Sequence, residues 1–400
     1  MLHPDWLMSQ LDELTVLYSD LHTDILKTIA KHLSDTLRAT GQLGLMPSTK
    51  KLIETAQTTG LRIEDIEKFL DKKFNLHIDV NNMMRATVTA SQMAMRELFE
   101  DASVESLRWD NEVYREAGLP EVVVRQSPTL NGLLEAGINK QIGQLARLTG
   151  TIAINSEELF ERTLNTAYNK VIAGTHSYTE ALRTGIDEMV AIGVGIFIYE
   201  SGRRISIESA LLTNIRTGVS QTAGQISHTA MLERNAPCCE TSAHIGARDT
   251  GEGYQNHEQW QGKVFSLLGK TEEYDDFYVA CGYGNVQGIY GANCRHSHRP
   301  FYPGITQRRW TPEKLKEYAN TQYTFTGADG KQKTVDAYKA EQILRGTERQ
   351  VREWKREIAI KQTANIDTSS EKKKLLYWQG RLRTFCEETG LRRQPIREQI

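Results

Sequence analysis

The stretch from residue 240 to residue 304 constrains the fold of this chain more than any other. It contains ten of the 30 glycines and four of the ten histidines in 400 residues, together with Cys281 and Cys294. Glycine has no Cβ atom and adopts positive φ angles readily, so this density predicts tight turns and close backbone approach in place of long helices. Histidine, cysteine, tryptophan and arginine among such turns are typical of a small, closely packed module.

The composition around this stretch is that of an ordinary soluble globular protein, with 39% hydrophobic residues, 25% charged residues and a net charge of -2. The length allows two or three domains with buried cores. There is no run of about 18 apolar residues and no signal-peptide pattern, so we expect no membrane contact and synthesis in a cytosol. Five cysteines are too few for a disulfide framework, which favours reduced thiols or a metal.

The first 190 residues predict long helices. Between residues 10 and 38, apolar side chains recur every three or four positions, which is one face of a helix. The pattern predicts short helices at 50–60 and 63–73 and a further long helix at 79–116. Gly118 to Pro120 then ends that segment.

Helix-start signals divide the next part of the chain. Pro128 follows Ser127 and opens a helix that we expect to run with interruptions towards residue 148. Asn155 or Ser156 is expected to cap a separate helix through residue 171. Ser177 and Glu180 form a capping box before the next helix. An apolar run at 193–199 and its return at 203–205 predict paired strands, followed by a helix at 207–232 with Ser206 as its cap.

The mostly charged, helix-like pattern after residue 305 predicts a charged helical tail. Thr311 and Pro312 are a strong helix start, and a turn at 327–330 predicts a hairpin within 323–335. The narrow apolar stripe of Val351, Trp354 and Ile358 predicts a helix that packs on the glycine-rich module or on a partner chain.

Taken together, these patterns predict a mainly α fold with three parts. The first is a helical region at 1–190, for which a subdivision near 118–128 is one alternative. The second is a compact, glycine-rich α+β module at 191–305. The third is the charged helical tail at 306–400.

The residues of the module form a recognisable signature. It reads H-x-x-W-Q-G-K-V-F from His257, and G-Y-G-x-x-x-G-x-x-G-x-N-C-R-H-x-x-x-P-F-x-P-G from Gly282. This resembles the type-2 minor capsid proteins of tailed phages, which in turn resemble the phage Mu protein F-like head-morphogenesis group. The signature positions are His244, Arg248, His257, Trp260, Gly262, Gly282, Gly284, Gly291, Asn293, Cys294, Arg295, His296, Pro300, Phe301 and Gly304.

The resemblance implies a structural protein of the virion, and no enzyme. It implies few copies in the phage head interior near the portal, made in the bacterial host cytoplasm. The implied partners are the portal protein, scaffold or major capsid proteins, and in some relatives packaged DNA. Two departures stand out: Leu211 and Leu212 replace an expected aromatic and basic pair, and Cys238 and Cys239 replace an Asp-and-Val-like lead into Glu240.

Three chemical interpretations of the module compete with simple packing. The residues His257, Cys281, Cys294 and His296 could bind zinc, with His244 and His298 as substitutes, although no C-x-x-C pair is present. The favoured alternative is that His257 and Trp260 pack under the turns and Cys294 is a buried thiol, with no cofactor.

A second interpretation is a hydrolase or modifying enzyme in which Cys294 is the nucleophile, one of the histidines the base, and Glu240 or Asp249 the orienting carboxylate. A third is DNA binding through the basic tail and a cluster of Arg295, His296, His298 and Arg299. We expect Arg248 and Arg295 instead to donate hydrogen bonds to backbone carbonyls of the turns.

Overall fold

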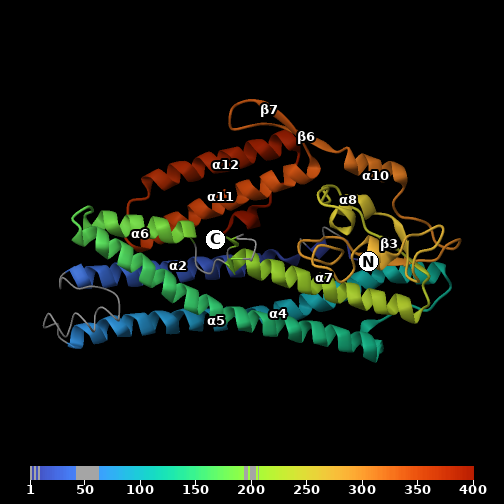
Figure 1. The fold of residues 1–400 in the computed structure, drawn as a ribbon, viewed down its shortest axis with the longest axis horizontal. Helices are drawn as coiled ribbons and strands as arrows, with labels where there is room; N and C mark the ends of the chain where they lie inside the picture. The colour runs from blue at the N-terminus through green and yellow to red at the C-terminus, as the bar shows by residue number, and fades with distance from the viewer. Residues whose placement is uncertain are drawn as a thin grey trace.

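A computed structural model gives the fold (Figure 1) and describes residues 2–3, 6–7, 10–41, 63–192, 197–198, 204–205 and 207–400. The helices are α2 (Asp12–Gly41), α4 (Ile63–Glu116), α5 (Pro128–Ile172), α6 (Tyr178–Ile192), α7 (Ile207–Glu233), α8 (His257–Trp260), α9 (Phe277–Ala280), α10 (Pro312–Ala319), α11 (Ala337–Thr363) and α12 (Ser369–Thr389). The strands are β1 (Phe197–Ile198), β2 (Arg204–Ile205), β3 (Cys238–Thr241), β4 (Val264–Ser266), β5 (His298–Phe301), β6 (Gln322–Thr326) and β7 (Gln332–Asp336), and the 3-10 turns are η1 (Val124–Gln126), η2 (Gly253–Gln255) and η3 (Pro395–Glu398). The predicted fold class, mainly α with a small strand-containing module, is confirmed.

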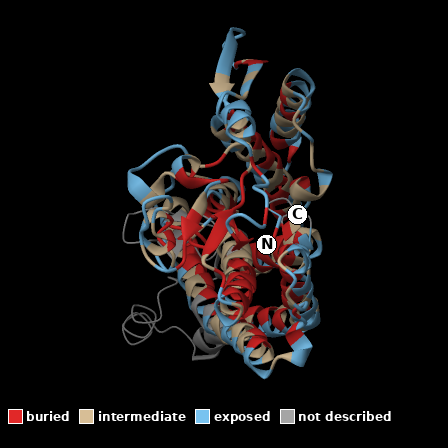
Figure 2. Ribbon diagram, turned by 90° about the vertical axis from the view of Figure 1, so that its right-hand side faces the viewer, coloured by how far each residue is buried: buried red, intermediate tan, exposed pale blue. Residues whose placement is uncertain are grey.

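Long helices form an elongated bundle that fills one side of the molecule (Figure 1). Helices α2, α4, α5 and α7 pack on one another, and α6 packs on α5. Seen end-on, the buried residues line the interior between the helices (Figure 2). Tyr18, Ile25 and Ile29 of α2 are fully buried there, together with Phe99 of α4 and Phe160 of α5. None of the described helices is long and apolar enough to cross a membrane.

Two long helices are continuous where the sequence analysis expected breaks. Residues 63–73 and 79–116 belong to the single helix α4, whose 54 residues include neither glycine nor proline to interrupt it. Helix α5 runs unbroken from Pro128 to Ile172, so the expected separate helix from residue 155 was wrong. Ser156 does not cap, because its hydroxyl donates to the Ile152 carbonyl within the helix at 2.7 Å. The predicted helix at 50–60 lies outside the described residues.

The other helix-start and turn predictions that fall on described residues are confirmed. Ser127 accepts a hydrogen bond from the Leu130 N–H at the start of α5. The Ser177 N–H donates to Glu180 Oε2 at 2.8 Å, which is the expected capping box. Thr311 caps α10, strands β1 and β2 pair antiparallel, and β6 and β7 form the predicted hairpin. The expected cap at Ser206 lies outside the described residues.

The glycine-rich module is built on a three-stranded antiparallel sheet with the order β4-β3-β5. Every residue of β3 and β5 is buried, and helices α4 and α7 both pack on β5. Short elements and turns, among them α8 and α9, make up the remainder of the module. This arrangement places the loops next to β3 and β5 against one end of the helical bundle (Figure 1).

The C-terminal helix α11 packs chiefly on α12, α2 and α6 and not on the module, and its packing on a partner chain stays a prediction. Val351 lies in a cluster with Phe325 and Leu382, which shows that the charged tail has a small core of its own. Arg356 is buried and donates to Ser19 and Thr23 of α2, in each case at 3.1 Å. Polar contacts therefore supplement the narrow apolar stripe.

One hydrophobic cluster joins the N-terminal helices, the module and the end of α11. Its members lie between Leu2 and Ile366 in the sequence. The three-part division at 1–190, 191–305 and 306–400 stays a prediction.

Candidate functional site

Three sequence-distant segments bring the ligand-type side chains of the module together. His244 follows β3, His257 begins the short helix α8, and Cys294 and His296 lie just before β5. Asn256 fixes the start of α8, because its side chain accepts a hydrogen bond from the Gln259 N–H. The strand pairing of β3 with β5 then sets the loop that carries Cys294 against α8.

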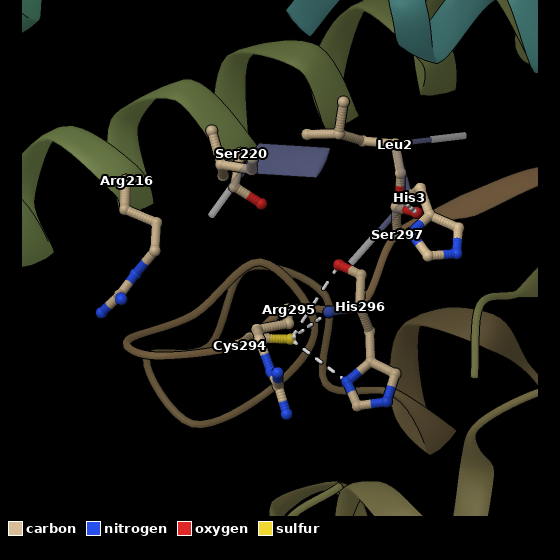
Figure 3. A pocket seen from close by; sticks show the side chains of 9 residues that line it. Leu2, His3, Arg216, Ser220, Cys294, Arg295, His296 and Ser297 are labelled. Carbon is tan, nitrogen blue, oxygen red and sulfur yellow. Dashed lines mark hydrogen bonds between the residues drawn. The ribbon is translucent and has the colours of Figure 1, made fainter. Parts of the chain in front are cut away.

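His257, Cys294 and His296 form a compact buried cluster. Their candidate ligand atoms all lie within 4.8 Å of one another. The Cys294 Sγ atom is 3.7 Å from His296 Nδ1. A dashed line in Figure 3 marks this contact. The ring of His244 stacks on that of His296 with centroids 4.5 Å apart, but His244 is not one of the three clustered residues. Cys281 is buried as well and also lies outside this cluster.

Backbone and amide oxygens fix the orientation of both imidazoles. His257 Nε2 lies 2.9 Å from the Gln287 carbonyl oxygen, and His296 Nε2 lies 3.2 Å from Gln261 Oε1. The same Gln261 oxygen accepts from the His244 N–H at 3.0 Å, which holds the amide in place. With Nε2 donating, Nδ1 of each histidine is the nitrogen that keeps a lone pair.

Burial sets the protonation states of the cluster. It lowers the pKa of His257 to about 4 and that of His296 well below its usual value, with neighbouring positive groups acting in the same direction for His296. Burial also raises the pKa of the Cys294 thiol to about 11. At neutral pH the two imidazoles are therefore uncharged, and the thiol on its own keeps its proton.

These properties give little support to the nucleophile interpretation. A catalytic cysteine requires a thiolate, which is favoured by a lowered pKa and not by a raised one. The carboxylate of Glu240, the first candidate for the orienting group, contacts Arg299 at 2.6 Å and the Arg309 N–H at 2.9 Å. Asp249, the second candidate, is exposed. The cluster is better suited to hold a ligand than to attack one.

A second buried network in the module was not anticipated from the sequence. His228 of α7 contacts the Tyr278 hydroxyl at 3.0 Å and His298 Nε2 at 3.1 Å. His298 Nδ1 in turn lies 2.6 Å from the Tyr290 hydroxyl. His228 is distant in sequence from the other three residues, and only the packing of α7 against β5 brings it to them.

The remaining signature residues shape the turns and the sheet. Gly262, Gly282, Gly284 and Gly304 have positive φ angles, and so does Asn293. At Gly291 a Cβ atom would lie 2.2 Å from the Val286 carbonyl oxygen, so no other residue fits there. The buried indole of Trp260 packs against the rings of His257 and His296, each at 4.7 Å, and Pro300 and Phe301 belong to β5.

The arginines only partly follow the expectation that they bind backbone carbonyls. Arg248 donates to the Ala292 carbonyl at 3.4 Å. Arg295 forms an ion pair with Glu341 of α11 at 3.0 Å, which links the module to the C-terminal helices. Arg299, which the sequence suggested only for DNA binding, donates to the Gln307 carbonyl at 2.8 Å.

Comparison with known proteins identifies a family that matches most of the chain. Residues 2–387 match the family described as phage minor capsid protein 2. A protein named "Structural protein" from Lactococcus phage LL-H is 24% identical over 249 residues, which cover 60% of this chain and 61% of that relative. The chain thus spans less than two thirds of the relative's length. No solved structure matches it. Because the match extends over nearly the whole chain, this protein belongs to the phage minor capsid protein 2 family and is a structural component of a phage virion.

Proposed function

We propose that this protein is a minor head protein that docks on the portal protein and takes part in procapsid assembly. The observation that carries the proposal is the family match over residues 2–387. Its place in the head interior near the portal, its synthesis in the bacterial host cytoplasm and its kinship with the Mu F-like group are parts of the same proposal.

The shape of the helical bundle supports a docking role. Helix α4 has 54 residues, which corresponds to a length of roughly 80 Å. Met93 and Val104 of α4 have exposed fractions of 75% and 63%. They are about three helical turns apart and so share one face of the helix. An extended helix that displays apolar side chains can lie along a neighbouring subunit.

The test is co-expression of the full chain with the portal protein of the same phage, followed by affinity purification and cross-linking. We expect co-purification with the portal, and cryo-electron microscopy of procapsids should show the protein at the portal vertex alone. Met93→Lys and Val104→Lys should weaken co-purification, whereas Leu268→Lys, an exposed apolar position in the module, serves as the matched control. Density spread evenly over the shell, or no retention of the portal, would contradict the proposal.

DNA contact is a second candidate function, now through the basic tail alone and not through the module. The expected cluster of Arg295, His296, His298 and Arg299 was wrong as a DNA surface, because both histidines are buried and both arginines are paired with carboxylates. The basic end of the tail is accessible. Lys372, Lys373 and Lys374 are exposed at the start of α12.

Retention of the full chain on double-stranded DNA tests this second candidate. Binding through phosphate contacts should weaken steeply as salt rises, because each contact releases counterions. Lys372→Glu with Lys373→Glu should reduce the slope of log affinity against log salt by about two. Retention that does not depend on salt, or that is unchanged in the double variant, would rule out the tail as a DNA contact.

A further inference from the structure

We propose that His257, Cys294 and His296 bind one zinc ion inside the module. The inference is independent of the docking role proposed above. It assigns a metal site to three of the four zinc candidates identified in the sequence and leaves out Cys281.

The spacing of the cluster fits tetrahedral zinc. With Zn–S near 2.3 Å and Zn–N near 2.0–2.1 Å, a sulfur and a nitrogen on one tetrahedral ion are about 3.6 Å apart. The distance between Cys294 Sγ and His296 Nδ1 is 3.7 Å. His257 contributes a third ligand atom within 4.8 Å of the other two. Small side-chain movements would bring all three to coordination distance.

The hydrogen bonds around the cluster are those that metal-binding histidines make. A ligating imidazole usually donates its other ring N–H to a carbonyl or carboxylate, which fixes the ring and its tautomer. Here the Gln287 carbonyl and the Gln261 amide oxygen accept from Nε2 of His257 and His296. Both histidines therefore keep the lone pair of Nδ1 available to a metal ion, and Nδ1 of His296 faces Cys294 Sγ. Simple packing of buried rings does not require this matched orientation.

The surroundings of Cys294 suit a zinc-bound thiolate. When zinc binds, the thiol proton leaves to solvent and the Zn–S bond forms. The positive charge of the metal then compensates the negative charge of the buried thiolate. Arg295, which also forms an ion pair with Glu341 at 3.0 Å, lowers the pKa of the Cys294 thiol through its positive charge, although burial still raises that pKa overall. Arg248 favours the thiolate electrostatically.

A small cavity beside the cluster can provide the fourth coordination position. Leu2, Ser220, Cys294 and His296 are among the residues that line it (Figure 3). Its volume of about 10 Å³ is close to the smallest space that holds one water molecule. With a water molecule in this cavity, the zinc would have three protein ligands and one water ligand. The metal would then cross-link α8 to the loop before β5.

The first experiment uses the full chain without an affinity tag. After removal of metal and reconstitution, we expect about one zinc per chain by mass spectrometry, in line with a single Cys/His site. Cobalt(II) should give the sulfur-to-cobalt charge-transfer band in the near ultraviolet, together with intense d–d bands that indicate tetrahedral coordination. A folded wild-type chain that binds neither metal in the presence of a weak competing chelator overturns the proposal.

Cysteine variants identify the ligand. Cys294→Ser should abolish the charge-transfer band, whereas Cys281→Ser and Cys386→Ser should keep it. Cys281 is the matched control for a buried thiol of the same module, and Cys386 for a thiol on α12. Circular dichroism confirms that each variant is folded. A band that survives in Cys294→Ser, or that disappears in Cys281→Ser while the fold is retained, overturns the assignment.

A variant of the orienting amide gives an independent readout. Gln261→Ala removes the acceptor of the His296 Nε2–H and leaves all three proposed ligands in place. We expect zinc affinity to fall by about 10–100-fold while the cobalt spectrum keeps its charge-transfer band. Unchanged affinity would mean that Gln261 does not orient a ligand, and the proposed coordination would be wrong.

Discussion

At the scale of single residues, the buried ion pair of Glu240 and Arg299 organises the end of the sheet. Glu240 is fully buried in β3, the central strand, and lies opposite Arg299 of β5. Its carboxylate also accepts from the backbone N–H groups of Arg309 and Trp310, so one side chain ties the chain after β5 back to the sheet. A carboxylate buried away from water is costly unless an opposite charge and hydrogen bonds replace its hydration, and Glu240 has both.

We expect Glu240→Gln to destabilise the protein by about 3–5 kcal/mol, because it leaves the guanidinium of Arg299 buried without its counter-charge. Urea denaturation followed by circular dichroism measures the change. The matched control is Glu317→Gln, which breaks the exposed pair with Lys314 on α10 and should cost less than about 1 kcal/mol. Equal losses in the two variants would contradict this role of Glu240.

At the scale of the elements, close helix packing depends on glycine at particular positions. Helix α5 approaches α7 so closely at Gly137 that a Cβ atom would lie 2.3 Å from Thr222 Oγ1. Thr222 is short, β-branched and buried, so it has little freedom to move away. At Gly143 of the same helix a Cβ atom would have no described neighbour within 4 Å. The two glycines therefore have different structural roles.

This difference predicts opposite effects for the same substitution. Gly143→Ala should stabilise the protein by about 0.5–1 kcal/mol, because alanine favours the helix. Gly137→Ala should instead destabilise it by about 1–3 kcal/mol through overpacking against α7. Thermal unfolding of both variants provides the measurement. Stabilisation by Gly137→Ala would show that α5 and α7 do not approach each other this closely.

The junction of α6, α11 and α12 predicts a pH dependence of stability. Glu371 of α12 contacts Lys361 of α11 at 2.8 Å, and Lys361 also pairs with Asp187 of α6. Burial alone would raise the pKa of Glu371, but hydrogen bonds from Lys361 and Ser370 outweigh it and lower the pKa from 4.5 to about 2.

Because the folded-state pKa is lowered, the stabilisation by Glu371 is present above pH 4.5 and is lost as the pH falls towards 2. Its size is at most about 3 kcal/mol. Urea denaturation at a series of pH values should show a smaller acid-dependent loss in Glu371→Gln than in the wild type. Parallel curves over this range would argue against the ion pair.

At the scale of the whole molecule, the glycine-rich module shares its core with the long helices. Trp260 and Phe277 of the module belong to the same hydrophobic cluster as Leu14 of α2 and Phe160 of α5. Helices α4 and α7 both contact β5. The module therefore relies on the bundle to cover its sheet.

A fragment of residues 191–305 should consequently fail to fold by itself. We expect poor dispersion in its amide NMR spectrum and rapid proteolysis, whereas the full chain resists the protease. The physical reason is that the apolar face of α7 would lose α4 and α5, and the exposed area would cost more than the isolated module can offset. A stable, well-dispersed fragment would instead support a division of the chain at residues 191 and 305.

The sequence by itself determined the local features of this protein. Helix caps at Ser127, Ser177 and Thr311 and the hairpin after residue 322 were predictable, because their signals act over three or four residues. The mainly α class follows from apolar periodicity. The glycine-rich signature pointed to the family and to the stretch that holds the candidate site.

Only the tertiary structure decided which of these residues meet. Breaks expected within α4 and α5 do not occur, because packing along a bundle extends helices past weak local stop signals. Cys281 and Cys294 look equivalent in the sequence, yet only Cys294 lies with His257 and His296. His228 and Arg356 gave no local signal, since their partners are 70 and more than 300 residues away. Contacts over such separations depend on how whole helices and strands pack, and local patterns carry no information about that.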